Sequence, residues 1–185
     1  MKLILTSCGF QTEGIKQKFL SYLNKNPIET KVVFIPTAAV YPDAVRVLPK
    51  CLNDLTKCGI PDSNINVYDL HFPMSKKELL EHDVVYICGG SPHYLLCRIN
   101  EHKFGESLKC FLKKGGIVVG VSAGSIIFAN NLPDNIGVFG ASLNVHCSAE
   151  CSVAEGELNL QDKNCVNLGN EQAIVYDKGK MFVIS

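Results

Sequence analysis

The sequence lacks a surplus of charge of either sign. Its 185 residues include 18 lysines and arginines and 18 aspartates and glutamates, so the formal net charge at pH 7 is zero. Nucleic acids and anionic membranes are bound by basic faces, so the composition predicts neither as a partner. A chain without net charge has no overall repulsion between copies, and we therefore expect that it can form a homodimer.

Long hydrophobic runs are also missing. No stretch approaches the roughly 20 apolar residues that a membrane-spanning helix needs. Near the start, Lys2 is followed by only three apolar residues before the polar Thr6. That run is too short for the core of a signal peptide. We therefore expect a cytoplasmic protein with no membrane partner.

Cysteine pairs with metal-ligand spacing are absent, although cysteine itself is frequent. The nine cysteines are an odd number, and no two of them form a Cys-x-x-Cys pair. The signatures of zinc ribbons and thioredoxins are therefore missing. Several cysteines lie inside apolar runs, as Cys88 does. We predict reduced, mostly buried thiols, with no metal site and no cofactor.

What the sequence does contain is an alternation of short β-rich runs with longer amphipathic stretches. This alternation predicts an α/β fold, a three-layer sandwich around a mostly parallel sheet. No repeat, low-complexity tract or linker interrupts it, so we predict a single domain over residues 1–185. The predicted strands are 2–6, 31–36, 65–69, 83–88, 117–120, 142–147, 173–176 and 181–184. The predicted helices are 13–23, 43–58, 106–114 and 123–130, with a short one capped by Ser75.

The C-terminal part departs from this alternation. Its last two predicted strands are separated only by residues 177–180, whose sequence is Asp-Lys-Gly-Lys. Such a short polar link with glycine is typical of a hairpin turn. We therefore predict a β-hairpin at the end of the domain.

The sharpest motif is Gly120-Val121-Ser122-Ala123-Gly124. It follows a predicted core strand and opens a predicted helix, the context in which Gly-x-Ser-x-Gly forms a nucleophile elbow. The two glycines allow neighbouring backbone to pass close to the turn. We predict that Ser122 is the nucleophile of a hydrolase. The alternative is an ordinary polar helix start, with Ser125 as a further polar residue of that helix.

A glycine pair, Gly89-Gly90, follows the predicted strand 83–88. Glycines at the carboxyl end of a strand let backbone N–H groups face a ligand. Together with the N–H of Ala123, one of them would make an oxyanion hole with two donors. Taken alone, the pair would more simply be a flexible turn.

A catalytic serine needs a base, and five histidines are available. His82 and His102 lie in charged stretches, and His71 lies in a predicted loop. His93 is close to the glycine pair in sequence, and His146 ends a predicted strand 24 residues after Ser122. The residue types and spacing leave both of these histidines open.

These residues together resemble a known family, the dipeptidase E and cyanophycinase group of serine peptidases. Their domain is similar to class I glutamine amidotransferases and has a flavodoxin-like arrangement. The resemblance spans nearly the whole chain and is most specific around Ser122. It is carried by residues 5–10 (Leu-Thr-Ser-Cys-Gly-Phe), 34–39 (Phe-Ile-Pro-Thr-Ala-Ala), 87–90 (Ile-Cys-Gly-Gly), 120–125 (Gly-Val-Ser-Ala-Gly-Ser) and 173–177 (Ala-Ile-Val-Tyr-Asp).

The resemblance implies roles for individual residues. Ser122 is then the nucleophile, His146 the base, and Gly90 the donor of an oxyanion N–H. The acid is then assigned to Asp134, and Glu150 remains an alternative. The implied reaction is hydrolysis of small peptides, among them peptides with an N-terminal aspartate, through an acyl-enzyme and without a cofactor.

The chain also departs from this group. Its region 131–165 is shorter than is usual in the group. Val145 and Cys147 flank His146, where the group often has proline before the histidine and an aromatic residue after it. Ser91 follows the glycine pair, where the group often has asparagine. An alternative is therefore a catalytically weak or inactive member of the same fold that binds a small ligand. A third hypothesis assigns the chemistry to a cysteine near His146, either Cys147 or Cys151, but it requires a lowered thiol pKa.

Overall fold

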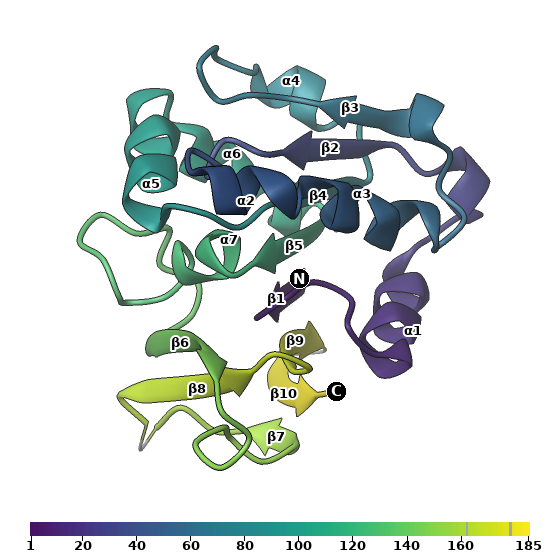
Figure 1. Cartoon of the computed structure of the whole chain (residues 1–185). Helices are drawn as coiled ribbons and strands as arrows, with labels where there is room; N and C mark the ends of the chain where they lie inside the picture. Colours follow the sequence, from purple (N-terminus) through teal and green to yellow (C-terminus); the bar gives the residue numbers. More distant parts are fainter. Residues whose placement is uncertain (162, 178) are drawn as a thin grey trace.

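The computed structural model describes residues 1–161, 163–177 and 179–185. Its main sheet has eight strands in the order β3-β2-β4-β5-β1-β9-β10-β7 (Figure 1). The first five strands of this order run parallel, whereas β9, β10 and β7 each pair antiparallel with the preceding neighbour. A separate parallel pair, β6 and β8, lies beside the C-terminal strands.

The strands of the main sheet are β1 (Lys2–Thr6), β2 (Val32–Ile35), β3 (Ile65–Val67), β4 (Val84–Ile87), β5 (Ile117–Val121), β7 (Gly156–Leu158), β9 (Ala173–Asp177) and β10 (Lys180–Ile184). The small sheet contains β6 (Ser142–Cys147) and β8 (Cys165–Gly169). The α-helices are α1 (Glu13–Tyr22), α2 (Pro42–Arg46), α3 (Leu48–Thr56), α4 (Lys76–Leu79), α5 (Pro92–Glu101), α6 (Phe104–Lys113) and α7 (Ala123–Ile126). Two short 3₁₀ helices are η1 (Pro27–Glu29) and η2 (Asp62–Asn64).

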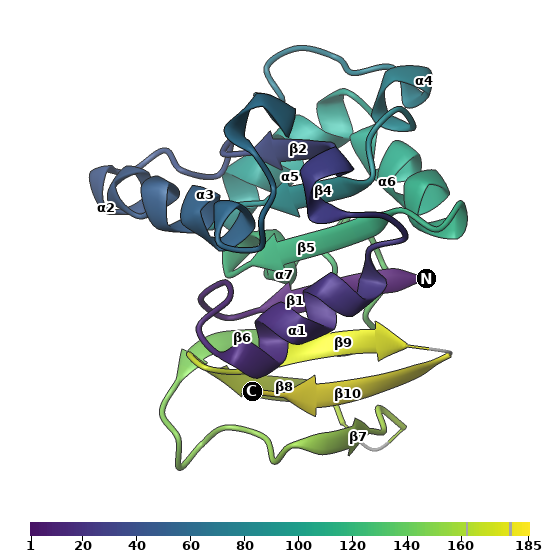
Figure 2. The same ribbon diagram turned by 90° about the vertical axis from the view of Figure 1, so that its right-hand side faces the viewer.

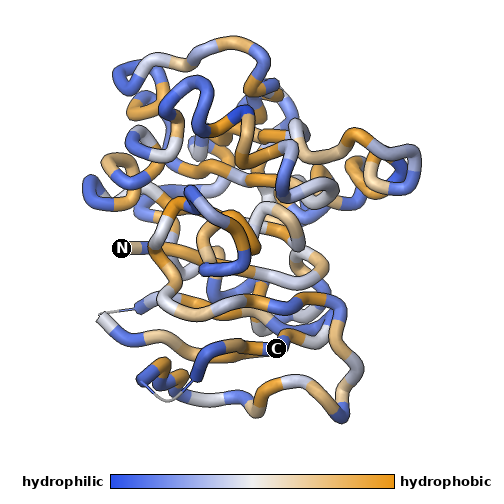
Figure 3. Tube along the Cα trace, turned by 90° about the vertical axis from the view of Figure 1, so that its left-hand side faces the viewer, coloured by the Kyte–Doolittle hydropathy of each residue, from blue (hydrophilic) through white to orange (hydrophobic). Residues whose placement is uncertain are grey.

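Two hydrophobic cores, one on each face of the sheet, make the fold a three-layer sandwich. On one face α1 and α3 pack against the strands through residues such as Phe19 and Leu55. On the other face α4, α5, α6 and α7 pack together with the β6–β8 pair. The orange segments of Figure 3 follow the central strands, while blue residues gather in the outer turns. The predicted α/β sandwich with a mostly parallel sheet is confirmed.

The N-terminal boundaries of several elements follow from capping residues. Thr12 caps α1 by accepting from the Ile15 N–H, and Ser75 caps α4 by accepting from the Glu78 N–H. Ser91 caps α5, and Pro92 occupies its first turn. Helix α5 is not among the predicted elements, although this cap and proline are typical of a helix start.

The predicted helix 43–58 is wrong as one element. It is divided at Val47 into α2 and α3, because Pro49 lies in the first turn of α3. Proline has no N–H to donate, and its ring collides with the carbonyl four residues earlier in a continuous helix. Figure 2 shows α2 projecting away from the rest of the molecule.

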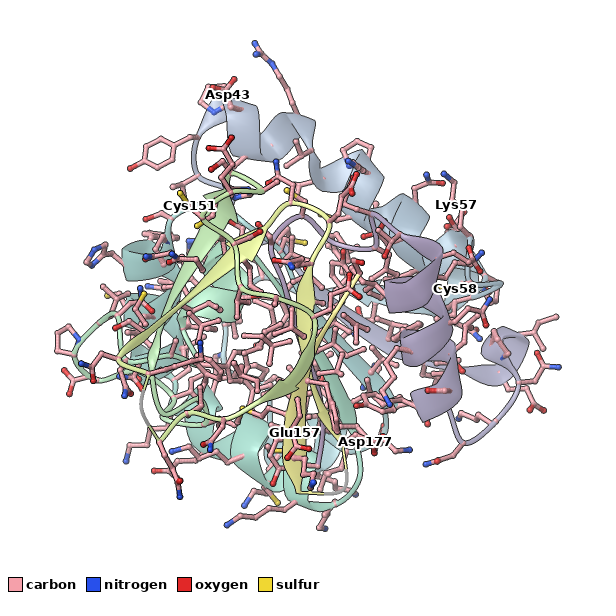
Figure 4. All side chains as sticks on the ribbon, turned by 90° about the horizontal axis from the view of Figure 1, so that it is seen from below. Asp43, Lys57, Cys58, Cys151, Glu157 and Asp177 are labelled. Carbon is pink, nitrogen blue, oxygen red and sulfur yellow. The ribbon has the colours of Figure 1, made fainter. Side chains whose placement is uncertain are left out.

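The C-terminal strands form a hairpin in which Lys180 pairs with Asp177. Lys178, in the predicted turn, lies outside the described residues. Figure 4 shows Asp177 and Glu157 at one end of these strands, and Asp43 and Cys151 on the opposite side of the molecule. Within the described ranges, no helix is long and apolar enough to cross a membrane.

Candidate active site

Ser122 occupies a tight turn between β5 and α7. Its backbone angles are φ 50° and ψ −109°, a conformation that few residues with a side chain adopt. A Cβ on Gly120 would lie 2.4 Å from the Gly124 carbonyl oxygen, and a Cβ on Gly124 would lie 2.3 Å from that of Ile87. Both positions therefore require glycine for the close passage of neighbouring backbone.

Hydrogen bonds from β1 hold this turn in place. The Ser122 N–H donates to the Thr6 carbonyl at 3.0 Å. The buried Ser125 hydroxyl lies 2.8 Å from the carbonyl oxygens of both Thr6 and Gly120. The Ser125 hydroxyl thus connects β1 and β5 next to the turn, and Ser125 is more than a polar residue of the helix.

His146 meets Ser122 from the other sheet. It lies on β6, and its Nε2 is 2.9 Å from the Ser122 Oγ. Its backbone has φ 61°, and its N–H donates to the Ser7 hydroxyl at 2.7 Å. Because β6 belongs to the small sheet, the pair depends on how that sheet packs against the main one.

Asn170 contacts the other side of the imidazole. Its Oδ1 is 3.0 Å from the His146 Nδ1. When Nδ1–H donates to this oxygen, the Nε2 lone pair is left to accept the Ser122 proton. Asn170 is not among the residues predicted for the site. It follows β8 directly, so only the pairing of β8 with β6 brings it to His146.

Two residues, Asp134 and Glu150, are the candidates for the acid. The backbone carbonyl of Asp134 accepts from the Asn100 side chain at 3.1 Å. Glu150 is an exposed residue of the turn that follows β6. Among the described residues, no hydrogen bond joins either carboxylate to His146, and His93 lies in the first turn of α5 without a bond to Ser122.

The glycine pair lies directly beside Ser122. A Cβ on Gly89 would be 3.3 Å from the Ser122 Cβ, and one on Gly90, where φ is 139°, would be 1.9 Å from the Ala38 carbonyl oxygen. Within the described ranges, the N–H groups of Gly89, Gly90 and Ala123 donate to no other group. These three amides, close to Ser122 in the turn and in the glycine pair, are thus without an acceptor in the described part of the chain.

The thiol nearest His146 belongs to Cys8. Its Sγ lies 3.3 Å from the His146 Nδ1 and donates to the Asn170 Oδ1 at 3.1 Å. Burial raises the pKa of the Cys8 thiol, which favours the neutral form. Cys147 is adjacent in sequence, but its thiol is directed to the Val145 carbonyl, and Cys151 is exposed in the following turn.

A cavity of about 460 Å³ opens over Ser122 and His146. One wall comes from α2 and α3, with the apolar side chains of Ala44 and Val47. Lys50 also lines the cavity and donates to Gln11 Oε1 at 3.0 Å. Besides His146, Lys50 is the only lining residue in the described ranges with a basic side chain, so the cavity presents one fixed positive charge. Among described residues, no cluster of three or more potential metal ligands is present.

Comparisons with known proteins agree with this fold. The model of peptidase family S51 matches residues 3–136. A candidate peptidase E from Listeria monocytogenes EGD-e superposes with a TM-score of 0.77 at 16% identity, over 99% of this chain and 97% of that one. A peptidase from an acI-B1 actinobacterium has a TM-score of 0.66 at 15% identity, over 100% and 87%. No curated protein matches the chain.

Proposed function

The chain belongs to peptidase family S51, and from that premise we propose that it is a serine peptidase that cleaves small peptides. Ser122 is the nucleophile, at a nucleophile elbow formed by β5, the strained turn and α7. The observation that carries the proposal is the 2.9 Å approach of the Ser122 Oγ to the His146 Nε2. The matched region ends at residue 136, so the assignment of His146 rests on this geometry.

The proposed reaction begins with the proton of Ser122. His146 Nε2 accepts it while the Oγ attacks the peptide carbonyl. The Nδ1–H bond to Asn170 fixes the imidazole orientation and stabilises the positive charge that develops on the ring. His146 then gives the proton to the leaving amine, and water releases the acyl group from Ser122 by the same route.

The carbonyl oxygen becomes negatively charged in the tetrahedral intermediate. We assign its stabilisation to the amides of Ala123 and of Gly89 or Gly90, because these residues adjoin Ser122. The loss of one such donor typically costs roughly 3 kcal/mol of transition-state stabilisation. No step of this reaction needs a metal or a cofactor.

Features of the cavity support the proposal that the substrates are small peptides with an N-terminal aspartate. Its volume of about 460 Å³ suits a small peptide rather than a folded protein. Lys50 supplies a positive charge for a substrate carboxylate, and Ala44 and Val47 offer apolar contact. An aspartyl side chain in this cavity would be paired rather than buried as an isolated charge.

A fluorophosphonate probe tests the assignment, because it reacts with activated serines. We expect the wild-type protein to be labelled and Ser122→Ala to remain unlabelled. Ser125→Ala is a less specific control, because it removes a structural hydroxyl beneath the same turn. A folded wild-type protein that is not labelled would refute the serine peptidase.

One observation favours a second function, binding of a small ligand with little or no hydrolysis. The acceptor at His146 Nδ1 is the neutral amide of Asn170 and not a carboxylate. An amide stabilises an imidazolium less than a negative charge would. Thermal stabilisation by an aspartyl dipeptide without release of its amino acids would favour this alternative.

A further inference from the structure

Asp54 is a buried acidic residue on α3, below the loop that joins β1 to α1. It is 9% exposed, and no other residue with a carboxyl group is buried within the described ranges. Burial raises the pKa of its carboxyl group. A buried carboxyl group is unfavourable unless its oxygens are hydrogen-bonded, so the partners of Asp54 indicate what it stabilises.

Its partners include the backbone of that loop. Asp54 Oδ2 accepts from the Phe10 N–H at 2.9 Å and from the Tyr86 hydroxyl at 2.7 Å. Gly9, with φ 81°, allows the contact, because a Cβ there would lie 2.3 Å from Oδ2. The carboxyl group therefore joins the loop to Tyr86 on the central strand β4.

The same loop holds both members of the Ser122–His146 pair. The Thr6 carbonyl, where the loop begins, accepts from the Ser122 N–H. Ser7, the next residue, accepts from the His146 N–H at 2.7 Å. The Gly9 N–H donates to the Thr6 hydroxyl at 2.9 Å, so the turn between Thr6 and Phe10 is fixed at both ends.

His146 needs such support. Its φ of 61° is uncommon for a residue with a side chain, and its side chain is exposed to the cavity. A strained backbone persists only where surrounding contacts hold it. A shift of the loop by a fraction of an ångström would move the Ser7 hydroxyl and lengthen the contact from Nε2 to the Ser122 Oγ.

We propose that Asp54 is a positioning residue for the Ser122 reaction, acting through residues 7–10 on His146. The inference rests on the proposed function, because it concerns the rate of that reaction. Asp54 touches no reacting atom: it acts through the Phe10 N–H, then the loop backbone, then Ser7. Tyr86 contributes by holding the carboxyl group from the side of the sheet.

Two variants at this position separate positioning from folding. Asp54→Ala removes the acceptor, whereas the amide oxygen of Asp54→Asn can still accept from both donors. We expect fluorophosphonate labelling of Asp54→Ala to be roughly tenfold to a hundredfold slower, since small displacements of catalytic groups have effects of this size. The loss should lie in the maximal labelling rate and not in the probe concentration for half-maximal rate. Asp54→Asn should restore most of the rate.

Cys58→Ala is the matched control. Cys58 is buried in the same core but beyond the end of α3, so its loss disturbs packing without removing the acceptor of Phe10. It should label as fast as the wild type even if its melting temperature falls. If Asp54→Ala does not fold, Gly9→Ala tests the same contact from the loop side and should also slow labelling.

The outcomes distinguish the two proposals. Wild-type labelling with an equal rate in Asp54→Ala would overturn the positioning role alone, as would equal rates in Asp54→Ala and Cys58→Ala. Failure of Asp54→Asn to recover the rate would overturn the hydrogen-bond explanation. Absence of labelling in the wild type would refute the proposed function and, with it, the role of Asp54.

Discussion

Asn170 offers a direct test of how His146 is oriented. Asn170→Ala removes the oxygen that lies 3.0 Å from Nδ1. In the reaction this oxygen faces an imidazolium, and a hydrogen bond to a charged group contributes about 1.5–3 kcal/mol. Since about 1.4 kcal/mol corresponds to a factor of ten in rate, kcat should fall roughly 10- to 100-fold. KM should change little, because Asn170 does not line the cavity over Ser122.

The assay is hydrolysis of an aspartyl dipeptide, followed by the release of free amino acid at pH 7. Asn170→Asp is the informative partner variant, because it keeps the acceptor in place and adds a negative charge. That charge favours the protonated imidazole. A carboxylate also stabilises the imidazolium of the reaction more than an amide does, so kcat should be equal to or above that of the wild type. Unchanged kcat in Asn170→Ala would refute the orienting role.

Four further predictions follow from other contacts of the site. Lys50→Met should lower kcat/KM for an aspartyl dipeptide by roughly tenfold or more and leave a neutral dipeptide unaffected, with Lys50→Arg as the control; the range follows from losing a hydrogen bond between charged groups. Gly90→Ala should reduce both turnover and melting temperature, because its Cβ would lie 1.9 Å from the Ala38 carbonyl oxygen; normal turnover would exclude this segment from the oxyanion site. Cys8→Ala should still be labelled by a fluorophosphonate, because the raised pKa of Cys8 keeps its thiol neutral at pH 7; loss of labelling would revive a role for cysteine. The raised pKa of Asp54 means that the folded state binds a proton there more tightly than the unfolded state. The contribution of Asp54 to the free energy of unfolding should therefore decline as pH rises from the ordinary aspartate pKa through the raised one. In denaturant titrations, Asp54→Asn should remove that decline.

Local sequence signals predicted the parts of the site that lie within one stretch of chain. Strand β5, the turn at Ser122 and the helix after it follow one another, and glycine at positions 120 and 124 is required by contacts that the motif itself predicts. The glycine pair at 89–90 follows its own strand in the same way. Alternation of strands and helices likewise predicted the sandwich, since each element buries one face against its neighbours.

The parts of the fold and of the site that the sequence does not predict depend on contacts between distant segments. Asn170 meets His146 only because β8 pairs in parallel with β6, and β8 was not predicted. The resemblance assigns the acid to Asp134, but the backbone carbonyl of Asp134 accepts from Asn100 on α5, a helix that the sequence pattern does not predict. Pro49 divided a stretch whose apolar spacing alone predicts one helix. Periodicity reports which residues are buried, and it does not report which segments meet.

The site is therefore assembled from residues of two sheets, which have different roles. Ser122 and the glycine pair belong to the main parallel sheet, where strand ends and glycines fix the backbone. His146 and Asn170 belong to the β6–β8 pair, which supplies the proposed base. Ser7 joins the two sheets: its hydroxyl accepts from the His146 N–H at 2.7 Å and also lies 3.5 Å from the His146 Nδ1. Ser7→Ala should consequently leave the main sheet folded and slow the reaction. Addition of a small hydroxyl compound should not restore the rate, because the lost bond restrains a strained backbone and does not supply a proton. Equal labelling rates in Ser7→Ala and the wild type would mean that packing of the small sheet alone is enough to hold the base.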